Sequence, residues 1–144
     1  MKRRDYMQAR KMDRVALRFW LLGLAQAAHS IEEMSSRLYD FMWTATGRLG
    51  LPRMGMTPTT FAVANMVIIA FLLGVAPFVS LRRPWAMAIA WSAAIIEILN
   101  GCGHLAGTLV FRGYVPGAAT APLLIAAGLA LLLALKGRSA GGIE

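Results

Sequence analysis

A histidine and two glutamates, His29, Glu32 and Glu33, stand in a stretch whose other residues are largely apolar. Successive residues of an α-helix advance by ~100°, so positions three and four apart share a face. If this stretch is helical, at least one glutamate therefore lies beside the histidine. Ionisable groups are expensive to place in hydrocarbon, and where they occur they mark functional sites by default. These three residues are the first candidate site.

A second polar set, Glu97, Asn100 and His104, lies in another apolar stretch. By helical periodicity the three side chains fall within about 60° of arc, and Glu97 lies about 10 Å from His104 along the helix axis. If the chain crosses a membrane four times, its first and third helices run in the same direction. Both polar sets then fall in the outer half of the bilayer, so we expect them to form one shared site.

The residue types in this site predict a metal centre. Neutral imidazole and carboxylate groups are ligands of zinc and iron, and helical bundles can hold such ions between side chains that project inward. The predicted ligands of a divalent metal ion, zinc or iron, are His29, Glu33, Glu97 and His104. The residues predicted to take part in catalysis are Glu32 as a general base or a support for the ligands, Glu97, and Asn100 and Tyr114 as groups that orient substrate or water.

Each of these side chains also has a structural interpretation. Glu33 could pair with Arg37, four residues further on, and a histidine in a helix is often a hydrogen-bonded packing residue. Cys102 is the only cysteine, so no internal disulfide can form, and we interpret it as a packing residue. Polar side chains and small residues often join membrane helices. We therefore expect an interhelical hydrogen bond from Asn65, and close helix approach at Gly101, Gly103 and Gly107.

The elements that must position these residues are membrane helices. The chain has 144 residues, of which 58% are hydrophobic and only 15% charged, and its apolar residues occur in long runs that are atypical of soluble domains. A membrane span needs about 20 residues. The sequence predicts an all-α integral membrane four-helix bundle that forms one domain over residues 1–144. The expected spans are 15–38, 61–79, 85–111 and 118–135, with a connector at 39–60.

The basic residues predict the orientation of this bundle. Lys and Arg lie at the ends of the apolar runs rather than along one face, which argues against a nucleic-acid partner. With both termini in the cytoplasm, eleven basic residues fall on the cytoplasmic side and four on the other. Cytoplasmic loops are typically enriched in Lys and Arg, so both termini are expected inside. The basic segment before residue 14 is interpreted as a solvated end that fixes the orientation.

Three short motifs resemble those of a known family. They are His29-Ser30-Ile31-Glu32-Glu33, Asn100-Gly101-Cys102-Gly103-His104, and Tyr114-Val115-Pro116-Gly117 followed by Thr120. Their order and spacing are similar to those of the HXXEE family of small bacterial integral membrane proteins, over residues 19–133. The resemblance implies a multi-pass protein of the bacterial inner membrane. It also implies that the family signature comprises His29, Glu32, Glu33, Asn100, His104, Tyr114 and Pro116.

A weaker resemblance is to the emopamil-binding, or sterol-isomerase, superfamily. Proteins of that superfamily also place a histidine, two glutamates and an asparagine inside a small helical bundle. His29, Glu33, Glu97 and Asn100 could play those parts, but the order and loop lengths are not close enough to claim membership.

Three functions are open at this point. The first is a metal-dependent membrane enzyme, a hydrolase or an oxidoreductase, that acts on a lipid or another apolar substrate. The second is a metal-free isomerase or cyclase in which protonated Glu33 or Glu97 gives a proton to an alkene. The third is an ion- or proton-coupled transporter or binding subunit, which four helices could form only as a homo-oligomer. The bilayer is the expected partner in all three.

Overall fold

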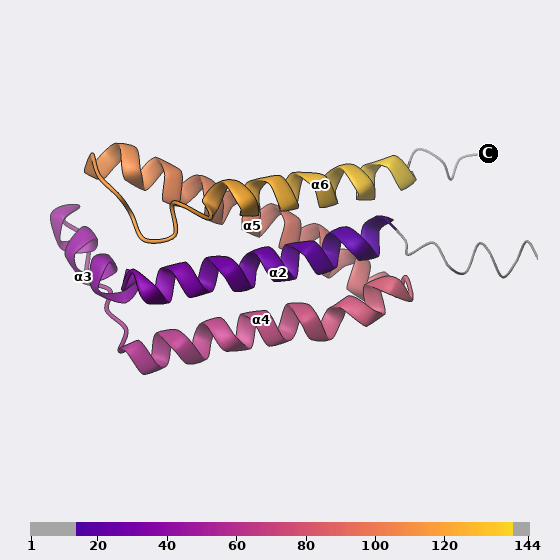
Figure 1. Cartoon of the computed structure of the whole chain (residues 1–144), viewed down its shortest axis with the longest axis horizontal. Helices are drawn as coiled ribbons and strands as arrows, with labels where there is room; N and C mark the ends of the chain where they lie inside the picture. Colours follow the sequence, from indigo (N-terminus) through magenta and orange to yellow (C-terminus); the bar gives the residue numbers. More distant parts are fainter. Residues whose placement is uncertain (1–13, 140–144) are drawn as a thin grey trace, which may run out of the picture.

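The computed structural model describes residues 14–139, so the basic segment before residue 14 lies outside the described residues. The described part of the chain is all-α, with helices joined by loops and no strand, as predicted. Its helices are α2 (Arg14–Ser35), α3 (Leu38–Arg48), α4 (Pro58–Ser80), α5 (Pro84–Phe111) and α6 (Ala121–Ser139). The four long helices run alongside one another, and the short α3 lies at one end (Figure 1).

The short helix α3 is an addition to the predicted elements, because it lies inside the segment expected to be a connector. The first helix was expected to continue to residue 38, but Arg37 adopts a left-handed conformation with φ 59°. A non-glycine residue in this conformation ends a right-handed helix. The chain therefore turns after α2 and begins a new helix, so the described residues contain five helices rather than four.

The boundaries of the apolar helices follow from local sequence. Thr57 caps α4, since its side chain accepts a hydrogen bond from the backbone N–H of Thr60 at 3.1 Å. Pro58 and Pro84 occupy the first positions of α4 and α5, where a missing N–H costs nothing. Arg112, with φ 50°, ends α5. The loop that follows dips toward α2 before α6 begins (Figure 1).

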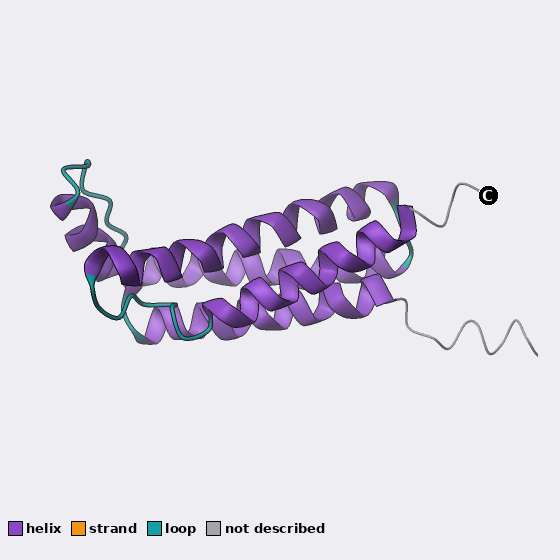
Figure 2. Ribbon diagram, turned by 90° about the horizontal axis from the view of Figure 1, so that it is seen from above, coloured by secondary structure: helices purple, strands orange, loops and turns teal. Residues whose placement is uncertain are grey.

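The apolar core lies toward the end of the molecule where α2 begins and α6 ends. Helix α2 packs against both α4 and α6, and α5 packs mainly against α6. Seen after a turn of 90°, the long helices again lie alongside one another (Figure 2). The largest fully buried side chains of this core include Phe19, Leu22 and Leu131. The opposite half of the bundle is where the buried polar residues gather, so the stable packing and the candidate site occupy different halves.

Glycine permits a close approach of α5 and α6. A Cβ atom at Gly101 would lie 2.8 Å from the carbonyl oxygen of Ala121, so a larger residue could not be accommodated there. The predicted role of Gly101 in helix approach is therefore confirmed. The same prediction is wrong for Gly103, because no atom lies within 4 Å of a Cβ placed there, and Gly107 faces Val115 of the loop rather than a neighbouring helix.

Two helices in the described residues, α4 and α5, are long and apolar enough to cross a membrane. The apolar stretch of α6, Ala121–Gly137, is shorter. Large apolar side chains are exposed on the outer faces of the helices, including Leu109 at 80%, Ile31 at 67% and Leu133 at 67%. Such surfaces are unfavourable in water, and they suggest a membrane environment.

Candidate metal centre

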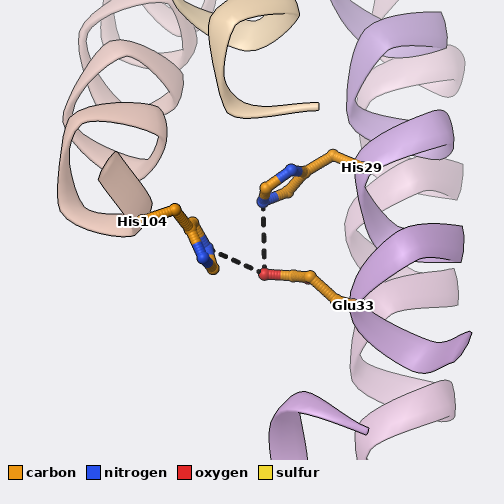
Figure 3. A group of neighbouring side chains, drawn as sticks. All are labelled: His29, Glu33 and His104. Carbon is orange, nitrogen blue, oxygen red and sulfur yellow. Dashed lines mark ion pairs between the residues drawn. The ribbon is translucent and has the colours of Figure 1, made fainter. Parts of the chain in front are cut away.

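Two histidines and one glutamate from two helices converge in the polar half of the bundle. Nε2 of His29 and Nε2 of His104 lie 3.2 Å and 3.1 Å from the same atom, Oε1 of Glu33 (Figure 3). The two imidazole rings meet edge to face, with centroids 4.7 Å apart. One potential ligand atom from each residue lies within 4.8 Å of the others, and all three residues are buried. This is the group whose geometry suits a single ion.

Local sequence explains how the three side chains meet. His29 and Glu33 are four residues apart on α2, so they share a helix face. His104 reaches them from α5. The loop backbone closes the group at Gly117, which has φ 94°; a Cβ atom there would lie 2.6 Å from His104 Nδ1 and 2.9 Å from His29 Cε1. Only glycine both adopts this conformation freely and leaves room for the two rings.

Thr120 fixes the proton position on His29. Its hydroxyl donates to Oε2 of Glu32 at 2.5 Å, so its single proton is already used. The 2.7 Å contact between Thr120 Oγ1 and His29 Nδ1 is therefore a hydrogen bond in which the imidazole N–H donates. In the neutral histidine the lone pair then lies on Nε2, the atom that faces Glu33. Supporting hydrogen bonds of this kind orient metal-binding histidines.

The charges and lone pairs in this group could accommodate a cation. Nε2 of His29 is buried and has no hydrogen-bond partner, although the carboxylate oxygen lies 3.2 Å away. A neutral imidazole would thus direct its lone pair toward an anionic oxygen, an arrangement that repels. A metal ion bound by both nitrogens and by Glu33 would remove this repulsion. Two imidazoles and one carboxylate are a known ligand set for zinc and for non-haem iron, with coordination positions left open.

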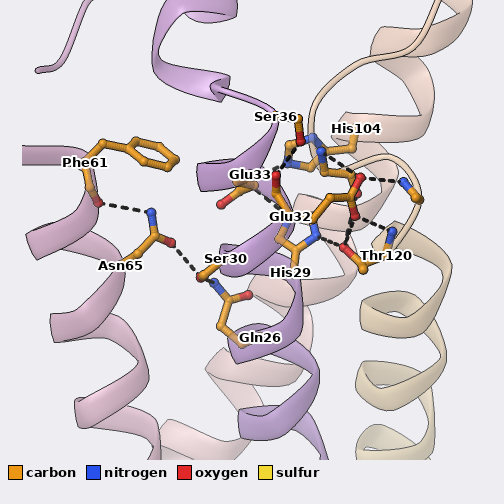
Figure 4. Close-up of polar contacts among 12 residues, drawn as sticks. Gln26, His29, Ser30, Glu32, Glu33, Ser36, Phe61, Asn65, His104 and Thr120 are labelled. Carbon is orange, nitrogen blue, oxygen red and sulfur yellow. Dashed lines mark hydrogen bonds and ion pairs between the residues drawn. The ribbon is translucent and has the colours of Figure 1, made fainter. Parts of the chain in front are cut away.

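Glu32, the neighbour of Glu33, points to the other side and anchors the loop between α5 and α6. One of its oxygens accepts hydrogen bonds from the Tyr114 hydroxyl at 2.5 Å, the Gly117 N–H at 3.2 Å and the Ala119 N–H at 3.0 Å. The other accepts from the Thr120 N–H at 2.7 Å and from the Thr120 hydroxyl. The two glutamates of the motif thus have different partners: Glu33 is directed to the histidines and Glu32 to the loop (Figure 4).

Tyr114 lies on the exposed rim of this anchor. Its hydroxyl contacts both Glu32 and Ser36, at 2.5 Å and 3.3 Å. The hydrogen bond to the Glu32 carboxylate raises the pKa of the Tyr114 hydroxyl above its ordinary value, because the anion favours the protonated phenol. In this structure Tyr114 holds the loop, and its role in orienting substrate or water stays a prediction.

A second line of hydrogen bonds connects α2 to α4. Asn65 Nδ2 donates to the carbonyl of Phe61 at 3.1 Å, and Asn65 Oδ1 accepts from the Ser30 hydroxyl at 2.6 Å. Ser30 in turn accepts from Gln26 Nε2 at 3.1 Å. The interhelical hydrogen bond predicted for Asn65 is confirmed, and Figure 4 shows the whole line.

Glu97 and Asn100 lie apart from the convergent group. The residues that could share one ion are His29, Glu33 and His104, and this set does not include Glu97. Glu97 is buried at 5% exposure and lines a cavity between α2, α4 and α5, together with Asn100. The structure therefore brings three of the four predicted ligands together. The proposed direct roles of Glu97, Asn100 and Glu32 in catalysis stay predictions.

The structure also settles some of the alternatives. Arg37 pairs with Asp40 at 2.7 Å rather than with Glu33. Cys102 is exposed. Sequence reasoning missed Thr120, Gly117 and Gln26 as parts of the polar network. For Gly117 and Thr120 the available signal was the loop motif at 114–120, but a motif alone does not tell which helix its backbone will contact.

Comparison with known proteins identifies the chain by its motifs. Residues 20–131, which are most of the chain, match the family described as "Protein of unknown function with HXXEE motif". No curated protein and no solved structure matches. These comparisons therefore do not support the weaker similarity to the sterol-isomerase superfamily.

Proposed function

The chain belongs to the HXXEE family, and we propose that it is a metal-dependent membrane enzyme that acts on a lipid or another apolar substrate. The observation that supports this proposal is the buried convergence of His29, Glu33 and His104 on one point. A buried carboxylate between two imidazoles is costly unless its charge is compensated. A bound divalent ion compensates it and supplies a reactive centre.

The proposed membrane placement puts the metal centre in the outer half of the bilayer of a bacterial inner membrane. All four long helices would cross it, with both termini of the chain in the cytoplasm. Arg14, Arg18 and Arg82 line a common cavity at the end of the molecule where α2 begins and α6 ends. Basic residues gather on the cytoplasmic side of membrane proteins, so this end would face inward and the metal centre outward.

The three ligands leave coordination positions for water or substrate. When bound, zinc or iron would polarise a substrate group or activate a bound water, which suits a hydrolase or an oxidoreductase. The roles of the chain's own residues follow from their contacts. His29, Glu33 and His104 would hold the ion. Thr120 would keep the proton of His29 on Nδ1, and Glu32 would hold the loop over the site.

Elemental analysis of the purified protein tests the proposal. We expect about one zinc or iron ion per chain in the wild type, and loss of it in His29→Ala, Glu33→Ala and His104→Ala, because each change removes one of only three ligands. Cys102→Ser is the matched control, since the exposed thiol belongs to the same helix as His104 and lies outside the convergent group. Wild-type protein without stoichiometric metal after expression in zinc- and iron-supplemented medium would contradict the proposal.

A second candidate function is a metal-free isomerase or cyclase, and one observation favours it. Oε2 of Glu97 is buried beside an apolar cavity and has no hydrogen-bond partner. A carboxylic acid in such surroundings can give a proton to an apolar substrate. The two functions differ in their response to chelation: a metal-free enzyme would keep its activity in a strong chelator, whereas the metal enzyme would lose it.

A further inference from the structure

A cavity of about 570 Å³ lies between α2, α4 and α5, outside the group formed by the two histidines and Glu33. This volume falls within the range of small-molecule sites, roughly 300–1,000 Å³. Its rim is made of exposed apolar side chains, among them Phe71 at 53% and Ile96 at 60% exposure. Its inner wall contains buried Leu72 and Ala93. The cavity therefore opens on the side of the bundle, the surface that would face lipid.

The lining of this cavity is almost entirely apolar. Its polar residues include Gln26, Glu97 and Asn100, and the first two are only 3% and 5% exposed. One buried oxygen on each of these two side chains, Gln26 Oε1 and Glu97 Oε2, has no hydrogen-bond partner. Buried polar atoms are almost always paired in folded proteins, and an exception calls for an explanation such as an absent ligand.

The hydrogen-bond line from α4 to α2 determines which group Gln26 presents. Asn65 uses its N–H to bind the Phe61 carbonyl, so its oxygen accepts from Ser30. The Ser30 proton is therefore used, and Ser30 must accept from Gln26 Nε2. The amide of Gln26 is thus fixed with its oxygen as the unpaired atom. What is missing beside this oxygen is a hydrogen-bond donor.

We propose that this cavity binds an apolar molecule that ends in a hydrogen-bond donor, a hydroxyl or an ammonium group, held by Gln26 Oε1 and Glu97 Oε2. The apolar part of the ligand lies against the inner wall and leaves through the lateral opening. A donor group of the ligand supplies the partners that the two oxygens lack. Leaving a buried acceptor unpaired is costly, so the site discriminates strongly against a ligand of the same shape without a donor.

Glu97 and Asn100 are also the lining residues of α5 nearest to His104 along the helix. Asn100 precedes His104 by four residues, about 6 Å along the axis of α5. A ligand anchored at Glu97 therefore has its polar end directed toward the histidines. The inference that this ligand is the substrate rests on the proposed function, whereas the binding itself does not require a metal ion.

Binding of three probes with the same alkyl chain tests the proposal: cetyl alcohol, cetylamine and cetyl methyl ether. The full-length protein is placed in lipid nanodiscs, and bound probe is counted by native mass spectrometry, with empty nanodiscs correcting for partition into lipid. We expect the alcohol or the amine to bind at least tenfold more tightly than the ether, which corresponds to the cost of one unpaired buried acceptor. A preference for the amine over the alcohol would identify the donor as ammonium.

Two variants and two controls locate this selectivity. Glu97→Leu and Gln26→Leu each remove one of the two unpaired oxygens, so each should lower the preference over the ether, and the double variant should reduce it to about twofold or less. The second variant serves if the first fails to fold. Cys102→Ser should keep the full preference, because Cys102 does not line the cavity. His104→Ala should lose metal and keep the preference, which separates failure of this inference from failure of the metal proposal.

Three results would overturn the inference. The first is equal binding of the ether and the donor probes to the wild type. The second is an unchanged preference in both Glu97→Leu and Gln26→Leu. The third is no specific binding of any probe, the result expected if lipid chains or a second copy of the protein fill the cavity.

Discussion

Two glutamates on opposite sides of α2 have very different surroundings. On the side of the α5–α6 loop, Glu32 receives five hydrogen bonds, and both of its oxygens are paired. On the side of α4 and α5, Glu97 borders a cavity and leaves one oxygen unpaired. A fully paired carboxylate stabilises the fold, whereas an unpaired one lowers stability and calls for an explanation, for which we propose a ligand.

Glu33 stands between these extremes. Its oxygen faces two imidazole nitrogens, but one of them, His29 Nε2, has no hydrogen-bond partner. The comparison of the three glutamates thus separates a structural anchor, a candidate metal ligand and a candidate ligand contact. All three are glutamates in apolar helices, so the difference arises from the partners that each side chain contacts.

The largest expected effect on stability comes from the anchor. Glu32→Ala removes the five hydrogen bonds by which Glu32 holds the loop, and we expect it to lower the free energy of unfolding by about 3 kcal/mol, the value of one or two charge-assisted hydrogen bonds after relaxation. Glu97→Leu should change it by less than 1 kcal/mol or raise it, since a costly unpaired group is lost. Chemical denaturation in detergent measures the free energy of unfolding of both variants. Equal destabilisation by the two substitutions would contradict the distinction between a structural Glu32 and an unpaired Glu97.

A smaller effect is expected where the anchor touches the metal centre. Thr120→Val keeps the shape of the side chain and removes the acceptor for the N–H of His29. Metal affinity should fall about 10- to 100-fold, the usual effect of losing a group that orients a ligand. Thr120→Ser retains the hydroxyl and should stay close to the wild type. Titration against a competing chelator measures these affinities. An unchanged affinity in the valine variant would show that Thr120 does not support metal binding by His29.

The smallest effect is expected at the exposed rim. Tyr114→Phe removes one of the five hydrogen bonds to Glu32, at a side chain that is 58% exposed, so about 0.5 kcal/mol should be lost at neutral pH. Because the folded state raises the pKa of Tyr114, its contribution is present below the ordinary tyrosine value of about 10 and is lost as the pH rises through the folded pKa.

Thermal unfolding between neutral pH and the alkaline range checks this contribution. The wild type and Tyr114→Phe should differ at neutral pH and converge as the tyrosine ionises. A difference that stays constant over this range would show that the hydroxyl contributes by packing alone.

Much of the candidate site could be predicted because it is local or periodic. The spacing of His29 and Glu33 places both on one helix face, and the position of His104 in an apolar stretch marks it as an unusual buried group. Glu97 shares the face of His104 by the same periodicity, yet it is not part of the convergent group. Periodicity predicts which face of its own helix a side chain occupies. It does not predict which residues of a neighbouring helix lie opposite that side chain along the helix axis.

By itself the sequence determined the helical class, the family, and the presence of several titratable groups in apolar helices, because these depend on composition, period and motif. Only the tertiary structure decided how the two adjacent glutamates divide their roles, with Glu33 on the histidines and Glu32 on the loop. It also decided that Glu97 faces a cavity. The physical reason is that the partners of Glu32 are mostly backbone N–H groups of a loop more than 80 residues away, and backbone groups carry no signal in the sequence.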